Sequence, residues 1–214
     1  MAASSSCPLG YGRRAEAPSA EPATSECPLG HTASSPSAGQ ATGGARSDGV
    51  ATLSREREVS NIPQANGEPF LYPSERQFWG AATAKGHEVD TRDMSMVIAI
   101  HNAVNEQTWR EILKYEKLHE KECAEPRLER FLGLPGTISP KARLLGLAGR
   151  TAPFDRHDWH VDRCGTRVRY LVDFYDGRPS DTHPISIHID ARPELSAGGL
   201  ADRLRLWAQG LNLF

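Results

Sequence analysis

One histidine, His101, stands in a sequence context that suits chemistry. Apolar residues recur around it at three- and four-residue steps between Met94 and Leu113, a spacing typical of one face of a helix. An imidazole among aliphatic side chains must satisfy two ring nitrogens, so it needs a hydrogen-bond partner or a metal ion. The residue pattern leaves two interpretations open, a core histidine with a local hydrogen bond or a ligand to a metal held from outside.

Two asparagines and a glutamate follow His101 closely, and their role depends on the helix. Asn102 and Asn105 either interrupt it, with Asn105 capping a second helix, or lie within one continuous helix. After an interruption, Glu106 would lie in the first turn of the second helix, where the helix dipole favours a carboxylate. On one continuous helix, Glu106 would point well away from His101.

The densest group of polar and aromatic residues is the stretch 153–159, PFDRHDW, followed closely by Arg163. Charged, aromatic and turn-prone residues on a connecting segment indicate a functional site. Arg156 and Arg163 carry the forked guanidinium group that binds carboxylates at two points. A salt-bridged loop without a ligand would have the same composition.

The four cysteines lie far apart, and two of them begin the same tetrapeptide, Cys-Pro-Leu-Gly, at Cys7 and Cys27. Proline holds such a segment extended and leaves the thiol exposed. An exposed thiolate is a soft ligand for haem iron or another metal. The spacing matches no zinc motif and argues against a disulfide framework. We therefore expect Cys123 and Cys164 to pack as small hydrophobic side chains.

Composition divides the chain into a tail and one domain. Residues 1–57 are rich in Ala, Gly, Pro and Ser, cannot bury enough apolar surface to offset ordering entropy, and are predicted to be disordered. Residues 58–214 are predicted to form the folded domain. A net charge of −2 argues against a nucleic-acid-binding polycation. The longest apolar run, Met96 to Ile100, is far shorter than the ~20 residues that span a bilayer.

Local patterns in the domain predict an α+β fold, with helices around a small antiparallel β-sheet. Ser74 and Gln77 form a capping-box signature for a helix that stops at Gly86. Ser139-Pro140 begins a short basic helix, which either lies on an anionic membrane surface or packs as a surface helix. Alternation with a period of two predicts strands at 168–174 and 185–189. The stretch 126–136 is expected to be a loop or partial helix, and 200–207 a last helix.

Together these motifs resemble the mitochondrial cytochrome c haem lyases, also called holocytochrome c-type synthases. The longest matches are HN..NEQ.W, from His101 to Trp109, and PFDRHDW at 153–159. Shorter matches are the runs SNIP at 60–63, YPS at 72–74 and RCGT at 163–166. The resemblance covers about residues 58–195. The chain departs from the family in the leucine after each Cys-Pro and in its C-terminal GLNLF.

The resemblance implies a lyase that joins haem to apocytochrome c through thioethers between the haem vinyl groups and the cysteines of a CxxCH segment. It implies that His101 is an axial ligand to haem iron, which we take to be ferrous. As the catalytic residues beside His101 we infer Glu106 and His157, either of which would assist proton movement or hydrogen-bond His101 Nδ1. Contacts with haem are expected from Trp79, Asn105, Glu106, Arg163, Arg156, Cys7 and Cys27. From charge alone, we infer that Arg156 or Arg163 pairs with the haem propionates.

The resemblance also implies peripheral attachment to the mitochondrial inner membrane, on its intermembrane-space face, and no nucleic-acid partner. Two other interpretations of the residues remain. One is a haem-binding chaperone or sensor without bond-forming activity, which would use His101 and the Cys-Pro thiols. The other is an interaction protein in which His101 is part of the core.

Overall fold

The structure is a computed structural model that describes residues 47–84, 86–87, 89–134, 136–178 and 186–210. Three short 3₁₀ segments lie at Ser47–Thr52, Thr91–Asp93 and Lys117–His119. The helices are α1 (Glu75–Ala84), α2 (Met94–Glu116), α3 (Pro140–Leu147) and α4 (Ala197–Ala208), and the strands are β1 (Val59–Pro63), β2 (Pro69–Leu71), β3 (Arg127–Gly133), β4 (Asp155–Arg163), β5 (Thr166–Asp176) and β6 (Ile187–Pro193).

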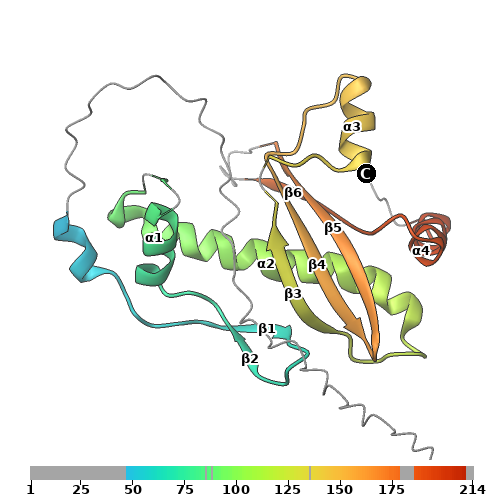
Figure 1. Cartoon of the computed structure of the whole chain (residues 1–214), viewed down its shortest axis with the longest axis horizontal. Helices are drawn as coiled ribbons and strands as arrows, with labels where there is room; N and C mark the ends of the chain where they lie inside the picture. The colour runs from blue at the N-terminus through green and yellow to red at the C-terminus, as the bar shows by residue number, and fades with distance from the viewer. Residues whose placement is uncertain (1–46, 85, 88, 135, 179–185, 211–214) are drawn as a thin grey trace, which may run out of the picture.

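The main sheet is antiparallel and has the strand order β3-β4-β5-β6, so each strand pairs with the next one along the chain. The long helix α2 runs across one face of this sheet, and α1 lies at the end of α2 away from the sheet (Figure 1). Strands β1 and β2 form a separate antiparallel pair that packs against α2. We call this pair the β1–β2 arm.

The main core lies between α2 and the sheet, and its pattern follows from the two periodicities. Helix α2 contributes Trp109, Ile112 and Tyr115, which recur at three-residue steps. Alternate residues of β4 and β5, including Trp159 and Tyr170, meet them from the sheet. A second, smaller cluster of Leu53, Phe78 and Met94 joins the segment before β1 to α1 and to the start of α2.

Several sequence predictions are confirmed. The fold is α+β with an antiparallel sheet. Helix α1 begins with the predicted capping box, in which Gln77 N donates to Ser74 Oγ and Ser74 N donates to Gln77 Oε1. Ser139 caps α3. The two predicted strands are present as β5 and β6, and α4 covers the predicted last helix. The division of the chain at residue 57 stays a prediction, although Leu53, before it, is buried.

Two secondary-structure predictions are wrong. Residues 127–133, expected as a loop or partial helix, form strand β3. The stretch 153–159, expected as a connecting segment, lies mostly in strand β4, where Asp155 to Trp159 are all buried. The charged residues of β4 suggested an exposed segment. They are buried instead, because their partners come from the strand itself and from the neighbouring strand rather than from solvent.

The structure decides one open alternative and overturns one expectation. Helix α2 is continuous through Asn102 and Asn105, so no second helix begins there. Cys123 and Cys164 form a disulfide with their Cα atoms 5.5 Å apart, instead of packing as separate thiols. They come together because the β4–β5 turn returns to the end of α2. Of the helices described, none is long and apolar enough to cross a membrane.

Candidate functional site

His101 lies on α2 with its side chain enclosed, and the residue is 4% exposed. Its Nε2 atom lies 3.1 Å from Nδ2 of Asn105, one turn further along the helix. Its Nδ1 atom has no hydrogen-bond partner among the described residues. The ring of Phe78, from α1, meets the imidazole edge to face with centroids 5.2 Å apart. The site is thus a buried imidazole that packs against an aromatic ring and has one nitrogen unpaired among the described residues.

Burial keeps this imidazole neutral at physiological pH. Burial, and secondly the charge of His157, lower the pKa of His101 from 6.5 to about 4. A neutral imidazole keeps a lone pair for a metal ion. Over the described ranges, no group of three or more His, Cys, Asp or Glu side chains is arranged to hold a metal ion. A single imidazole suits an iron whose other ligands come with it, as the four porphyrin nitrogens of haem do.

His157 lies in the core on β4 and is fully buried. Its ring stacks on Phe131, with centroids 6.1 Å apart, and meets Phe174 edge to face. Its Nε2 atom lies 3.0 Å from Oδ2 of Asp155, although the two are not aligned as a hydrogen bond. The structure therefore shows a buried contact between a histidine and a carboxylate, and the charge of that histidine contributes to the lowered pKa of His101.

Trp79 lies on α1 directly after Phe78, and its ring packs against the smaller cluster that includes Met94. Its indole Nε1 donates to the carbonyl oxygen of Val89 at 3.2 Å, and the side chain is half-buried. Trp79, Phe78 and His101 thus belong to one contact between α1 and α2.

Glu106 points away from His101, because five residues on a continuous helix separate side chains by about 140°. Its Oε1 atom accepts hydrogen bonds from Ser60 Oγ at 2.6 Å and from Tyr72 Oη at 3.0 Å. The backbone N–H of Asn61 donates to the same oxygen at 3.1 Å. Burial and the nearby Glu106 raise the pKa of Tyr72 above its usual range, so the phenol stays a donor. Glu106 fastens the β1–β2 arm to α2.

Arg163, at the end of β4, contacts Glu116 at the far end of α2, and Glu116 lies about 22 Å along the helix axis from His101. Its guanidinium group donates to both carboxylate oxygens of Glu116, at 2.7 and 2.9 Å. Tyr170 Oη donates to the same carboxylate at 2.5 Å. Burial lowers the pKa of Arg163, but Glu116 outweighs it and the net shift is upward. Arg163 therefore holds the sheet to the end of α2.

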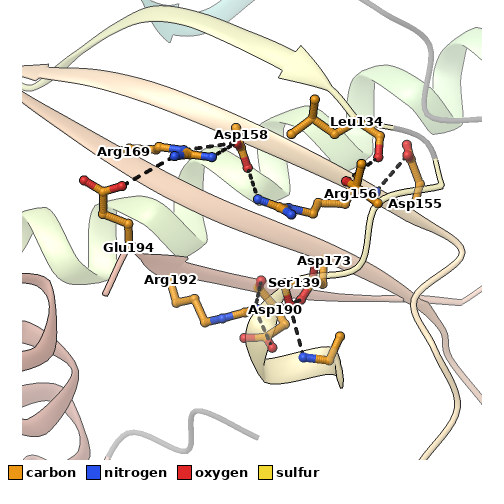
Figure 2. A network of polar contacts seen from close by, with 12 residues as sticks. Leu134, Ser139, Asp155, Arg156, Asp158, Arg169, Asp173, Asp190, Arg192 and Glu194 are labelled. Atoms are coloured by element: carbon orange, nitrogen blue, oxygen red, sulfur yellow. Dashed lines mark hydrogen bonds and ion pairs between the residues drawn. The ribbon is translucent and has the colours of Figure 1, made fainter. Parts of the chain in front are cut away.

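Arg156 lies on the sheet face opposite α2, since it alternates with the core residue His157. Figure 2 shows Arg156 and Arg169 converging on Asp158, with Arg156 Nη2 3.0 Å from Asp158 Oδ1. Nearby, Arg192 binds Asp173 at 2.5 Å, and Ser139 Oγ donates to the same carboxylate. These contacts form a polar layer on the sheet face opposite α2, and the Ser139 contact joins it to the start of α3.

The structure thus divides the predicted site residues among three places. His101, Asn105 and Trp79 lie at the α1–α2 contact, with His157 within electrostatic reach. Glu106 faces the β1–β2 arm, while Arg163 and Arg156 lie at the end of α2 and on the far sheet face. Cys7 and Cys27 lie outside the described residues.

Sequence reasoning did not find the partners of the buried charges. Glu116 and Tyr170 were not singled out as partners of Arg163, nor Asp158 as the partner of Arg156 and Arg169. One signal was present. In β4, charged residues alternate with His157, Trp159 and Val161, a period of two that is typical of a strand with one face on the core.

Comparisons with known proteins find one family. A family model described as "Cytochrome c/c1 heme lyase" matches residues 2–207. A putative holocytochrome-c1 synthase of Schizosaccharomyces pombe is 42% identical over 163 residues, covering 72% of this chain and 75% of that protein. The holocytochrome c-type synthases of Gallus gallus and Homo sapiens are each 44% identical over 162 residues, which is 72% of this chain. No solved structure matches the chain.

The chain belongs to the cytochrome c/c1 haem lyase family, since the family model spans nearly all of it. Within that family, these three relatives bear the names of synthases for holocytochrome c and holocytochrome c1. The match covers 59% and 60% of the chicken and human proteins, so the chain spans about three-fifths of their length.

Proposed function

We propose that this protein is a holocytochrome c-type synthase, a lyase that attaches haem covalently to apocytochrome c. Each of the two thiols in the substrate's CxxCH segment adds across one haem vinyl group. The sulfur bonds to one vinyl carbon and the proton passes to the other, so two thioethers form without an oxidant. The observation that carries the proposal is the buried, neutral His101 with an unpaired ring nitrogen, in a chain of the haem lyase family.

In this mechanism His101 provides one axial ligand to the ferrous iron of the haem substrate. The residue is 4% exposed, so haem reaches it only when α1 moves away from α2. Phe78 and Trp79 then face the macrocycle from α1. Asn105, 3.1 Å from Nε2, orients the imidazole ring.

Apocytochrome c supplies the other axial ligand through the histidine of its CxxCH segment. That bond holds the two neighbouring thiols near the two vinyl groups, a proximity effect. The nucleophiles belong to the substrate, so no enzyme cysteine takes part in bond formation. The enzyme chiefly binds and orients its two substrates.

The remaining predicted residues have roles that depend on their present partners. Glu106 is proposed to act through the β1–β2 arm that it binds. His157, whose Nε2 atom lies 3.0 Å from Asp155, is proposed to assist proton movement. Pairing of Arg156 or Arg163 with the haem propionates, proposed from charge, requires each arginine to leave its carboxylate partner. For Arg163 it also requires a rearrangement, because its partner Glu116 lies about 22 Å along α2 from His101. Cys7 and Cys27 are proposed as regulatory haem ligands in the tail.

The family suggests a mitochondrial location. Within the mitochondrion, we propose that the protein lies on the intermembrane-space face of the inner membrane, attached peripherally. Haem and apocytochrome c are its proposed partners, and no nucleic acid is expected, since the net charge is −2.

The decisive experiment compares wild type with His101→Ala after coexpression with an apocytochrome c. The absorption spectrum of the purified protein reports bound haem, and acid–acetone extraction separates free haem from covalently attached haem. Wild type is expected to bind haem and to yield haem that cannot be extracted from the cytochrome. His101→Ala is expected to do neither, because the iron loses its protein ligand.

His160→Ala is the matched control, since His160 is a partly exposed imidazole on β4. It is expected to behave like wild type. If His101→Ala binds as much haem as wild type, His101 is a core histidine, and the iron ligand is His157, His160 or a Cys-Pro thiol. Haem that binds to wild type but stays extractable throughout would contradict bond formation.

A further inference from the structure

Exposed apolar side chains are concentrated in two stretches of the described chain. Eleven large hydrophobic residues are exposed among the described residues, and seven of these lie between 138 and 207. They are Ile138, Leu144, Leu147, Leu195, Leu200, Leu204 and Trp207. All seven lie on α3, on α4 or directly before these helices.

Helix α4 is apolar on two sides. One side packs inward through Leu206, which is 1% exposed and belongs to the main core. On another side Leu200, Leu204 and Trp207 follow at four- and three-residue steps, and Trp207 is 65% exposed. A helix that only covered a core would carry polar residues on its outer face. The outer face of α4 therefore lacks a partner among the described residues.

Helix α3 combines exposed leucines with cations. Leu144 and Leu147 are exposed, Leu147 to 87%. Arg143 lies beside Leu144, and Arg150 follows the helix, both exposed. The whole stretch 130–154 contains no Asp or Glu. Although the chain has a net charge of −2, this part of it is positive.

The two helices flank the same edge strand, β6. Before and within α3, Ser139 and Lys141 bind Arg192 and Asp190 on the outer face of the sheet. Helix α4 packs against β6 and, through Leu206, joins the core on the α2 side. Figure 1 shows both helices on the side of the molecule beyond β6. We call their exposed residues the α3–α4 face.

We propose that the α3–α4 face docks on a membrane surface that contains anionic phospholipids. Leucine side chains and an indole ring enter the interface between headgroups and acyl chains, while the arginines meet the phosphates. Each Arg or Lys near an anionic surface adds to the attraction, which salt weakens. The inference rests on the peripheral attachment included in the proposed function, and it names the surface responsible.

Sedimentation with vesicles tests this face without haem or apocytochrome c. One set of vesicles contains phosphatidylcholine alone, and the other contains equal parts of phosphatidylcholine and phosphatidylglycerol. The full chain is expected to sediment with the anionic vesicles and to be released by salt. Trp207 fluorescence is expected to shift to shorter wavelength on binding and to return on release, because Trp207 is the exposed indole among the described tryptophans.

Variants that place a negative charge on the face identify the surface. Leu147→Glu on α3 and Leu204→Glu on α4 are each expected to weaken vesicle binding about tenfold, since each removes an inserted leucine and adds a repelled charge. Met96→Glu is the matched control, because Met96 on α2 is 63% exposed and lies outside the face. It is expected to bind within about twofold of wild type.

Three outcomes would overturn the proposal. The first is a loss of vesicle binding in Met96→Glu as large as in the two leucine variants. The second is a loss in only one of Leu147→Glu and Leu204→Glu, which would mean that the two helices do not bind the membrane as one face. The third is concentration-dependent dimerisation in solution that the two leucine variants abolish while vesicle binding is absent. Covalent cytochrome formation without any vesicle binding would contradict this inference while leaving the proposed lyase intact.

Discussion

At the scale of single residues, His101 combines burial with an unpaired ring nitrogen, which is energetically unfavourable. Its ring is buried, and its Nδ1 atom has no hydrogen-bond partner among the described residues. Leaving a buried polar atom unpaired costs about 1–3 kcal/mol. A ligand that opens the α1–α2 contact and binds the ring replaces this cost with a new bond. The fold thus keeps the imidazole neutral with one nitrogen unpaired, as the proposed role of iron ligand requires.

The lowered pKa of His101 predicts a pH-dependent stability. A free histidine titrates near 6.5, whereas burial, followed by the charge of His157, lowers the pKa of His101 to about 4. As pH falls below 6.5, the unfolded chain binds a proton that the folded protein does not bind until about pH 4, so stability is lost across this window. Wild type is expected to lose about 3 kcal/mol more than His101→Asn between pH 7 and 4.

Urea unfolding of both proteins at several pH values measures this difference. The two proteins share every other titrating group, so their difference isolates His101. Parallel loss of stability in wild type and His101→Asn would mean that the imidazole is accessible to protons in the folded state.

At the scale of elements, α2 has a different partner at almost every turn. It meets α1 at His101, the β1–β2 arm at Glu106, the sheet at Trp109 and Arg163 at Glu116. Its asparagines do not break it, because their side chains bind elsewhere. Asn102 Nδ2 donates to Glu58 at 2.7 Å and Asn105 contacts His101. Neither competes with the helical backbone.

The arm gives a prediction for Glu106. Glu106→Ala removes the acceptor of hydrogen bonds from Ser60, Asn61 and Tyr72. We expect a loss of about 2–4 kcal/mol in the free energy of unfolding. Hydrogen exchange should also quicken across β1 and β2. Chemical denaturation and exchange mass spectrometry measure the two effects.

Glu111→Ala is the control for that variant, because Glu111 binds Gln107 and Lys114 of the same helix. Such a pair contributes less than about 1 kcal/mol. Similar losses in Glu106→Ala and Glu111→Ala, or unchanged exchange in the arm, would show that Glu106 does not hold the arm.

At the scale of the whole molecule, two links hold the end of α2 to the sheet. One is the buried contact of Arg163 with Glu116 and Tyr170. The other is the disulfide between Cys123, just after α2, and Cys164, in the β4–β5 turn. Cys164 has a φ of 47°, in the left-handed region that favours glycine, and Gly165 follows with a φ of 94°. A two-residue turn of this kind suits a tight hairpin.

Reduction of the disulfide is expected to lower the free energy of unfolding. The disulfide closes a loop with a sequence separation of 41, for which chain entropy predicts a stabilisation of about 4 kcal/mol. In a Cys7→Ser/Cys27→Ser background, thiol titration in denaturant should find no free thiol before reduction and two after it, since the chain has four cysteines. Cys164→Ser in that background should unfold at lower urea concentration.

Reductant should then have no further effect on the Cys164→Ser protein, which serves as the control. Two free thiols before reduction, or an unchanged unfolding midpoint in Cys164→Ser, would show that the pair does not support the fold.

Features set by neighbouring residues could be read from the sequence. The Ser74–Gln77 capping box, the Ser139 cap and the alternation in β5 and β6 depend on residues a few positions apart. So does the apolar stripe that places His101 within a helix. Family motifs such as PFDRHDW also carry the haem lyase resemblance, because a motif is a run of neighbouring residues.

Features set by distant partners were decided only by the tertiary structure. Strand β4 was missed because its buried Arg156 and Asp158 are stable only beside each other and Arg169 of β5. The disulfide was missed because its cysteines meet only when the β4–β5 turn reaches the end of α2. The direction of Glu106 depended on whether α2 was continuous. Burying a charge or pairing a thiol requires a partner, and only the complete fold determines which distant residue supplies it.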